Sequence, residues 1–277
     1  KSSISSAVKQ LESLLGTSLL LRSTRSVQMT HDGLVFYERC KDLLADMDEL
    51  QTLFHNEETT LTGRVRIDLP VGIARSIVIP HLPEFSALHP QLRLEISSTD
   101  RLVDLIREGF DCVMRIAHLD DSNLVARPLG QLRQINCASP AYLQKQGTPT
   151  CIADLKQHQL IHYASNFAST NMGFEYLENG ERKSIKMQGN ITVNNSDAYQ
   201  AAALAGLGII QAPDIALKPW IALGHLVEIL DQTQAPALPI SLLYPSRRHI
   251  SRRVRLVMEW LAQIMHEHTS PTKIDSP

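Results

Sequence analysis

Strand-like and helix-like segments alternate in this chain from residue 63 to residue 266, and this alternation restricts the possible folds more than any other feature. The first strand-like segment places Val65, Ile67 and Leu69 at every second position, as on one buried face of a strand. Such alternation predicts an α/β domain with a mostly parallel sheet. The expected helices cover 77–88, 100–108, 197–205 and 249–266, and the expected strands cover 65–71, 92–97, 110–116, 124–130, 159–163, 190–193 and 239–245.

The alternation runs through two similar rounds, the second of which begins near Cys137, and the last strand and helix return to the first round. This order predicts a domain of two lobes over residues 63–267. We expect lobe I to comprise about 63–136 and 240–267, and lobe II about 137–239. A ligand of such a domain is expected in the crevice where strand ends and helix starts of both lobes meet.

Composition excludes several classes of protein. The 27 basic and 29 acidic residues give a net charge of -2, so the chain is no polycation that coats nucleic acid by charge alone. No run of about 18 apolar residues occurs that could span a membrane. The N-terminal residues KSSISSAVKQ lack the apolar core of a secretory signal. The four widely spaced cysteines are typical of free thiols in a reducing compartment, so we expect a cytoplasmic protein.

The first 30 residues form a small positive segment, with four basic residues and one acidic residue. Ile4, Val8 and Leu11 lie on one face of a predicted helix that ends at Gly16. Small hydroxyl residues and a lysine lie on the other face, where they could contact phosphates and base edges. An ordinary amphipathic surface helix has the same pattern.

Residues 19–30 predict a short hairpin, because Leu19, Leu21, Val27 and Met29 alternate on either side of a polar turn that contains Arg25. A helix followed by a basic hairpin is the layout of a winged helix-turn-helix, in which the wing reaches an adjacent groove or phosphate.

A long helix follows the hairpin, with Thr30 as its expected cap. Its apolar residues recur at alternating steps of three and four, which predicts a heptad seam between two helices and hence a homodimer or homotetramer. The same residues could instead pack on the chain's own core. The predicted dimer seam consists of Phe36, Cys40, Leu43, Met47, Leu50 and Phe54.

The N-terminal segment resembles the DNA-binding module of LysR-type transcriptional regulators, whose pattern is S-x-x-I-x-x-L-E-x-x-L-G, then L-F-x-R-x-x-R, then L-T-x-x-G. The segments LIREGFDCVMRI, LVARPLG, SPAYLQKQG and AAALAGLGI resemble the effector domain of the same family. Ser6 stands where many members carry arginine. The matching N-terminal positions are Ser5, Val8, Leu11, Glu12, Leu15, Gly16, Leu20, Leu21, Arg22, Arg25, Met29, Thr30 and Gly33.

This resemblance implies a DNA-binding transcriptional regulator that a small molecule controls. The implied fold is an α/β effector domain of the type 2 periplasmic-binding-like class, preceded by a partial all-α winged helix-turn-helix and a coiled-coil linker helix. It also implies that the chain begins within the turn before the recognition helix. The expected domains are a recognition helix and wing at 1–30, a linker at 31–62, the effector domain at 63–267 and a disordered tail at 268–277. The expected contacts with promoter DNA are Lys1, Ser2, Ser3, Ser5, Ser6, Lys9, Arg22 and Arg25.

Three turns in the two-lobed domain offer hydroxyl, amide or backbone N–H groups at a helix start, which suits a carboxylate or another polar effector. Each turn also suits plain helix capping. Arg75 and Arg115 could balance an anion or form internal ion pairs. The candidate effector residues are Pro70, Val71, Gly72, Ser97, Ser98, Thr99, Arg115, Asn195 and Ser196.

Motifs for catalysis, metals and cofactors are missing from the sequence, which contains no G-x-S-x-G elbow, P-loop, G-x-G-x-x-G or H-E-x-x-H. We therefore expect a sensor that needs no catalytic residue, metal or cofactor. The alternative is a solute-binding protein or an enzyme on the same two-lobed scaffold. That alternative does not explain the basic hairpin or the heptad seam.

Overall fold

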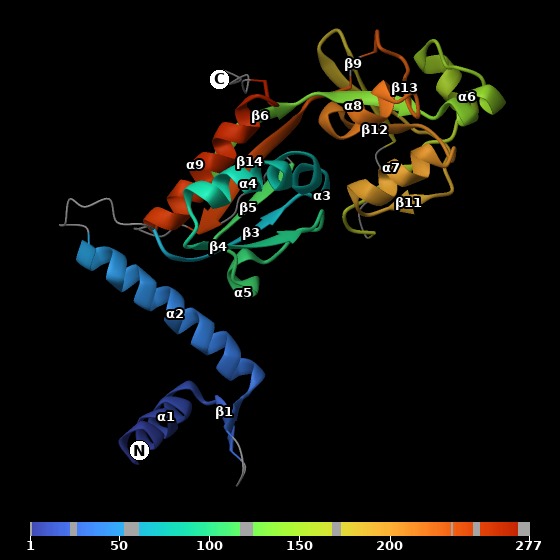
Figure 1. Cartoon of the computed structure of the whole chain (residues 1–277). Coiled ribbons are helices and arrows are strands. Elements are labelled where there is room, and N and C mark those ends of the chain that lie inside the picture. The colour runs from blue at the N-terminus through green and yellow to red at the C-terminus, as the bar shows by residue number, and fades with distance from the viewer. Residues whose placement is uncertain are drawn as a thin grey trace. The chain divides into compact units, whose positions relative to one another are not determined.

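The computed structural model of the chain describes residues 2–22, 27–52, 61–116, 124–167, 173–233, 235–245 and 250–270. The chain divides into two compact units, Lys1–Arg64 and Val65–Pro277 (Figure 1).

The first unit contains a helix, a hairpin and a long helix, as the sequence predicts. Helix α1 (Ser2–Leu15) is followed by Gly16, whose φ of 70° is the left-handed conformation that favours glycine. Strands β1 (Leu20–Arg22) and β2 (Val27–Met29) pair antiparallel, and α2 spans His31–Thr52. The Glu12 side chain joins α1 to the hairpin, because its Oε1 accepts from the backbone N–H groups of Leu19 at 2.7 Å and Leu20 at 3.0 Å.

Thr30 caps α2 and holds the start of this helix against the hairpin. Its Oγ1 accepts from the Gly33 N–H at 2.9 Å and donates to the Ser18 carbonyl at 2.7 Å. Gly33 lies against the backbone at Leu19, where a Cβ atom would lie 1.9 Å from the carbonyl oxygen. Thr30 and Gly33 therefore fix the junction between the hairpin and α2.

Lobe I of the second unit contains a five-stranded sheet in the order β4-β3-β5-β14-β6. Strands β3 and β5 are parallel, but β14 lies between β5 and β6 and is antiparallel to both. Strands β3, β5 and β6 therefore point the same way, as expected for a mostly parallel sheet, and among these four strands only β14 runs against them. The strands are β3 (Gly63–Leu69), β4 (Leu92–Ser98), β5 (Cys112–Ile116), β6 (Leu124–Leu132) and β14 (Leu238–Pro245).

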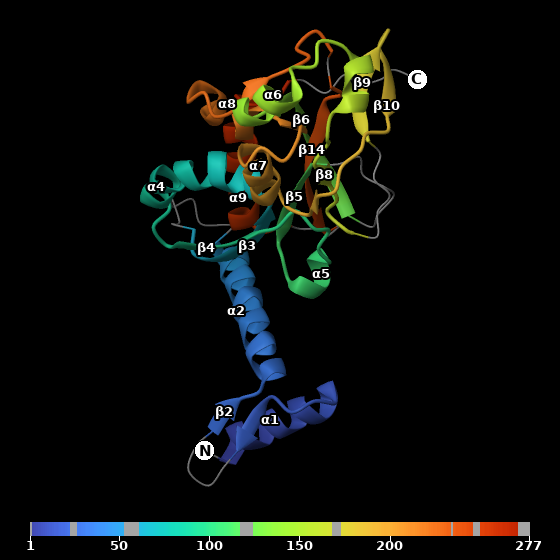
Figure 2. The same cartoon turned by 90° about the vertical axis from the view of Figure 1, so that its right-hand side faces the viewer.

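Helices α4 and α9 cover one face of this sheet, and they lie side by side in Figures 1 and 2. Phe85 of α4 packs against Trp260 of α9, with ring centroids 4.4 Å apart. The helical run begins at Val71, not near Ile77 as predicted, because Pro70 serves as its N-cap with φ of -57°. The elements are α3 (Val71–Ile73), the π-helical turn η1 (Ala74–Val78), α4 (Ile79–Leu88) and α9 (Arg252–His266).

A short helix, α5 (Leu105–Glu108), packs on the opposite face of the sheet. Leu105 and Phe110 contact Val113 of β5 there, whereas the neighbouring Cys112 and Met114 point into the other core. The helix predicted over 100–108 is therefore wrong for its first half. Asp104 ends the loop and caps α5, because its side chain accepts from the Arg107 N–H.

Lobe II is built on the antiparallel sheet β12-β7-β13. Ile135 and Cys137 of β7 pack against α7 and α8, whereas Ala138 belongs to the core beside α6. Neither α8 nor the β9–β10 hairpin was predicted from the sequence. The elements are β7 (Gln134–Ala138), α6 (Pro140–Gln146), the 3-10 helix η2 (Ile152–Gln157), β8 (His162–Tyr163), β9 (Phe174–Glu178), β10 (Glu181–Ile185), β11 (Thr192–Val193), α7 (Ser196–Leu204), β12 (Ile210–Pro213), α8 (Asp214–Ala222) and β13 (Val227–Glu228).

The end of the described chain is attached to lobe I. The Gln131 N–H donates to the Ser270 carbonyl at 2.9 Å, and the Ser270 N–H donates to the Gln131 carbonyl at 3.0 Å. The prediction of a disordered tail from residue 268 is therefore wrong for 268–270, and 271–277 lie outside the described residues. Within the described parts of the chain, no helix combines the length and apolar character that a membrane span requires.

Candidate effector cavity and DNA-binding segment

A cavity of about 740 Å³ lies between the two lobes of the second unit. Lobe I supplies the end of β3, the loop after β4 and the end of β5. Lobe II supplies the segments around β8 and β12 and the starts of α7 and α8. Most of the lining side chains are apolar. The polar and charged lining residues are Thr99, Asp100, Arg115, Gln134, His162, Tyr163, Ser165, Glu175, Ser196, Tyr199, Gln200 and Gln211.

Of the nine candidate effector residues, five line this cavity: Pro70, Gly72, Thr99, Arg115 and Ser196. The other four have different places. Ser97 and Ser98 belong to strand β4, so the turn expected there is wrong for these two residues. The Asn195 side chain accepts from the Ala198 N–H at 2.8 Å, which is plain capping of α7. The backbone N–H of Val71 is bonded within the protein, as described below.

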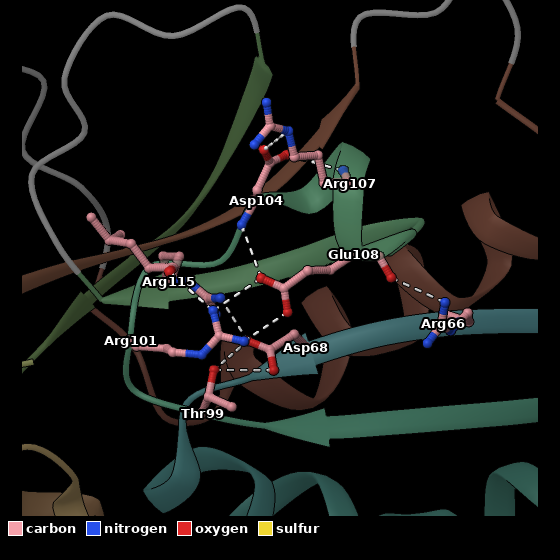
Figure 3. A network of polar contacts seen from close by, with 9 residues as sticks. Arg66, Asp68, Thr99, Arg101, Asp104, Arg107, Glu108 and Arg115 are labelled. Atoms are coloured by element: carbon pink, nitrogen blue, oxygen red, sulfur yellow. Dashed lines mark hydrogen bonds and ion pairs between the residues drawn. The ribbon is translucent and has the colours of Figure 1, made fainter. Parts of the chain in front are cut away.

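Arg115, which lines the cavity, is held in a buried ion pair with Asp68, and Figure 3 shows both residues. Its Nη2 lies 2.6 Å from Asp68 Oδ2, and its Nη1 donates to the Met114 carbonyl at 2.7 Å. Asp68 is fully buried, and its Oδ2 also accepts from the Thr99 hydroxyl at 3.1 Å. Asp68 therefore balances the charge of Arg115, as in the second of the two alternatives that the sequence left open.

A second ion pair holds the loop between β4 and α5 (Figure 3). The guanidinium of Arg101 donates to both carboxylate oxygens of Glu108, at 2.9 and 2.7 Å. This hydrogen bonding lowers the pKa of Glu108 and raises the pKa of Arg101. The Asp104 N–H adds a bond to Glu108 Oε1 at 3.2 Å. The loop that carries Thr99 and Asp100 is thus fastened at both ends.

Asp100 was not predicted as a site residue from the sequence, which placed it at the first residue of a helix over 100–108. The structure places Asp100 at the cavity wall, half-buried. Its Oδ1 accepts from the Val71 N–H at 2.9 Å, and its Oδ2 accepts from the Ser196 N–H at 2.6 Å. The one available signal was its position three residues after the predicted strand 92–97, where a polar residue can reach the crevice.

Tyr163 and Tyr199 form an aromatic pair in the cavity wall, with ring centroids 5.3 Å apart. Burial raises the pKa of the Tyr163 hydroxyl, and so do the negative charge of Asp100 and a hydrogen bond to it. Burial also raises the pKa of Tyr199, whose hydroxyl accepts from the Gln211 N–H at 3.1 Å. Both tyrosines are therefore neutral at physiological pH and can act as hydrogen-bonding groups.

The first unit presents part of the predicted DNA-binding set on α1. Ser5, Ser6 and Lys9 are exposed on this helix. Ser2 and Ser3 lie in its first turn, and Arg22 ends β1. Lys1 and Arg25 lie outside the described residues. The assignment of these residues to DNA contact stays a prediction.

The predicted dimer seam runs along α2. Phe36 and Cys40 are half-buried, whereas Leu43 is 63% exposed and Met47 is 56% exposed. Leu50 belongs to the same helix, and Phe54 lies outside the described residues. Large apolar side chains in the middle of α2 are therefore exposed in the single chain.

Comparisons with known proteins identify the family. The helix-turn-helix module described as "Bacterial regulatory helix-turn-helix protein, lysR family" matches residues 1–34, and the LysR substrate binding domain matches residues 58–265. The chain is 45% identical over 268 residues to YhjC of Escherichia coli, an uncharacterized HTH-type transcriptional regulator, and this match covers 97% of the chain and 90% of YhjC. It is 34% identical to an HTH-type transcriptional repressor of Pseudomonas aeruginosa, over 97% of the chain and 84% of the relative.

Solved structures agree with this assignment. The structure of CrgA from Neisseria meningitidis, a LysR-type transcriptional regulator, matches with a TM-score of 0.66 and 28% identity, over 95% of this chain and 88% of CrgA. The full-length structure of AphB from Vibrio cholerae matches with a TM-score of 0.62 and 26% identity, over 96% of this chain and 90% of AphB. The resemblance noted in the sequence is thus confirmed, and the chain belongs to the LysR family of helix-turn-helix transcriptional regulators.

Proposed function

We propose that this regulator reads promoter DNA with α1 and the β1–β2 wing, and that a small molecule in the cavity between its lobes controls this binding. The observation that carries the proposal is the exposed row of Ser5, Ser6 and Lys9 on α1, next to a hairpin that Glu12 fastens to the helix. Small hydroxyl residues allow a helix to lie close to base edges, and a lysine adds a phosphate contact.

Arg25→Ala is expected to weaken DNA binding at every sequence, because an arginine in the wing contacts phosphate and not a particular base. The measurement is the binding constant of the full-length parent for its own upstream DNA across a salt series. The slope of log K against log salt should become less steep by about 0.9 for each phosphate that the variant no longer neutralises. Ser5→Ala is expected to change the preference among sequences instead.

Lys145→Ala is the matched control, because this exposed cation lies on α6 of the second unit. It should leave both the affinity and the salt slope unchanged. An Arg25→Ala protein that binds as tightly as the parent at every salt concentration contradicts the assignment of Arg25. A parent without salt-sensitive binding to its upstream DNA contradicts the proposed promoter contact itself.

We infer that two chains pair along α2, which supports a homodimer or a homotetramer built from such pairs. The exposed Leu43 and Met47 lie on the predicted heptad seam and need an apolar partner. Leu43→Lys should raise the dissociation constant of the dimer by about two orders of magnitude, because it places a charge where pairing would bury a leucine. Sedimentation of the full chain over a concentration series measures this change.

Val35→Lys serves as the control for the seam, because Val35 lies on the same helix, is 50% exposed and falls outside the heptad positions. It should leave the assembly intact. If Leu43→Lys and Val35→Lys sediment alike, α2 is not the dimer contact.

The two-lobed domain is proposed to act as a sensor and not as a catalyst. Its cavity is lined mostly by apolar side chains, with hydroxyl and amide groups at intervals. This pattern suits recognition of a small molecule. Effector binding would favour one arrangement of the lobes over another and so shift the population that binds DNA. Because promoter DNA is the proposed partner, we place the protein in the cytoplasm.

A further inference from the structure

We propose that Asp100 is a carboxylate of the cavity wall that joins the two lobes and thereby sets the class of effector, which is an organic molecule without negative charge and not a carboxylate. This inference rests on the proposed function of the cavity as an effector site, and it adds the chemistry of the ligand.

The bridging geometry is the first step. Asp100 follows β4 in lobe I, and its two oxygens accept from one N–H of each lobe, Val71 of lobe I at 2.9 Å and Ser196 of lobe II at 2.6 Å. A hydrogen bond with the Tyr163 side chain adds a second contact with lobe II. Hydrogen bonds to a charged acceptor are stronger than those between neutral groups. Asp100 therefore couples lobe I to the beginning of α7.

A second contact between the lobes involves the first two turns of the same helix, α7. Arg75 of lobe I pairs with Asp197 at 2.6 Å and donates to Gln200 Oε1 at 2.7 Å. Gln200 is buried and donates in turn to the Ala216 carbonyl at 2.7 Å. The Arg75–Asp197 pair is largely exposed and contributes little by itself. Together with Asp100, however, it fixes the first turns of α7 against lobe I.

The charges at the cavity wall disfavour an anionic ligand. Arg115 is neutralised by Asp68 at 2.6 Å, and Glu175 is neutralised by Arg182 at 2.6 Å. Among the residues that the structure describes, no cation forms an ion pair with Asp100, so its carboxylate leaves the wall negative. A free carboxylate could reach the Val71 and Ser196 N–H groups only by displacing Asp100. A tethered carboxylate competes at an effective concentration of about millimolar or higher.

The cavity nevertheless offers hydrogen bonds to an uncharged molecule. The Ser196 Oγ is shielded from solvent and has no hydrogen-bond partner in the part of the chain that the structure describes. It belongs to the cavity wall, as do the Gln200 side chain and the two tyrosines. The tyrosine hydroxyls in a mostly apolar wall are suited to bind a hydroxyl, carbonyl or amide group of a ligand.

The test compares Asp100→Ala with wild type in the full chain, without DNA or effector. The variant should unfold at a temperature several degrees lower than wild type, and tens of millimolar sodium formate should restore about half of this loss, because formate replaces the missing carboxylate. Formamide, or sodium chloride at equal ionic strength, should restore none of it. Amide exchange over residues 194–200 should become about tenfold faster, the change expected when one hydrogen bond to a charged group is removed.

Asp154→Ala is the matched control. Asp154 also accepts from two backbone N–H groups, those of Thr150 at 2.8 Å and Cys151 at 3.1 Å, but all three residues lie within lobe II and outside the cavity wall. This variant should leave exchange over 194–200 unchanged. Asp100→Asn provides a second variant that keeps the size of the side chain and loses its charge, so exchange at Ser196 should rise in it even if Asp100→Ala does not fold.

Two results would overturn the proposal. Exchange over 194–200 that is equal in wild type, Asp100→Ala and Asp100→Asn would show that Asp100 does not join the lobes. Formate that stabilises wild type as much as Asp100→Ala would show that the cavity accepts a carboxylate beside Asp100. Neither readout depends on DNA binding, so a failure of the proposed promoter contact would be seen separately.

Discussion

Asp68→Ala is expected to lower the free energy of unfolding of the second unit by about 3–5 kcal/mol, because it leaves the guanidinium of Arg115 buried without its counter-charge. Asp68 is fully buried and Arg115 is 6% exposed, so water cannot take the place of the missing carboxylate. The Thr99 hydroxyl loses an acceptor in the same variant. Urea unfolding of the full chain, followed by tryptophan fluorescence, measures the loss.

The control for this prediction is Glu228→Ala, which removes one partner of the more exposed Arg133–Glu228 pair. It should cost no more than about 1 kcal/mol, as is usual for pairs near the surface. Replacing both buried partners, in Asp68→Leu with Arg115→Met, should recover much of the stability, because no charge remains buried. Equal losses for Asp68→Ala and Glu228→Ala would refute the importance of the buried pair.

Gly33→Ala is expected to destroy the junction between the wing and α2, and with it DNA binding by the full-length parent. In an ordinary helix this change is favourable by about 1 kcal/mol, because alanine has the higher helix propensity. At Gly33 the added Cβ would lie 1.9 Å from the Leu19 carbonyl oxygen, which is a backbone atom and cannot rotate away. The clash therefore outweighs the propensity, and a loss of about 1–3 kcal/mol or more is expected.

The loss of the junction can be measured by the rate of proteolysis at the junction between the hairpin and α2, and by the affinity for promoter DNA. Gly180→Ala is a suitable control, because Gly180 has φ of 82° in the β9–β10 turn and a Cβ atom there would meet no atom within 4 Å. It carries only the conformational cost of a left-handed residue, about 1–2 kcal/mol, and should not affect DNA binding. Full DNA affinity in Gly33→Ala would mean that the junction can relax.

Local patterns predicted local elements well. Gly16 and Thr30 marked the end of α1 and the start of α2, because capping and left-handed conformations depend on a few neighbouring residues. Alternating apolar residues located β3, β4 and β14, and the two-lobed class followed from their order. The antiparallel placement of β14 between β5 and β6 could not be predicted, because it depends on residues more than a hundred positions apart.

The candidate site was predicted only in part, because local patterns identify some of its residues and contacts between distant residues determine the others. Pro70, Gly72, Thr99, Arg115 and Ser196 were found as cavity residues, since strand ends and helix starts identify the edge of the crevice. Asp100 was missed, because its importance comes from an N–H group 96 positions away in the other lobe. The partner of Arg115 was open for the same reason, since Asp68 looks like any polar residue in a strand until the sheet is assembled.

The position of β14 has a consequence for biosynthesis. Residues 238–245 complete the sheet of lobe I, yet they follow all of lobe II in the chain. During translation, β5 and β6 therefore leave the ribosome with unpaired edges that can join other chains, and they must wait until lobe II has been made. Early folding of lobe II would shorten the effective loop between β6 and β14, which lowers the entropic cost of pairing these strands. Completion of the lobe I sheet in the nascent chain therefore depends on prior folding of lobe II.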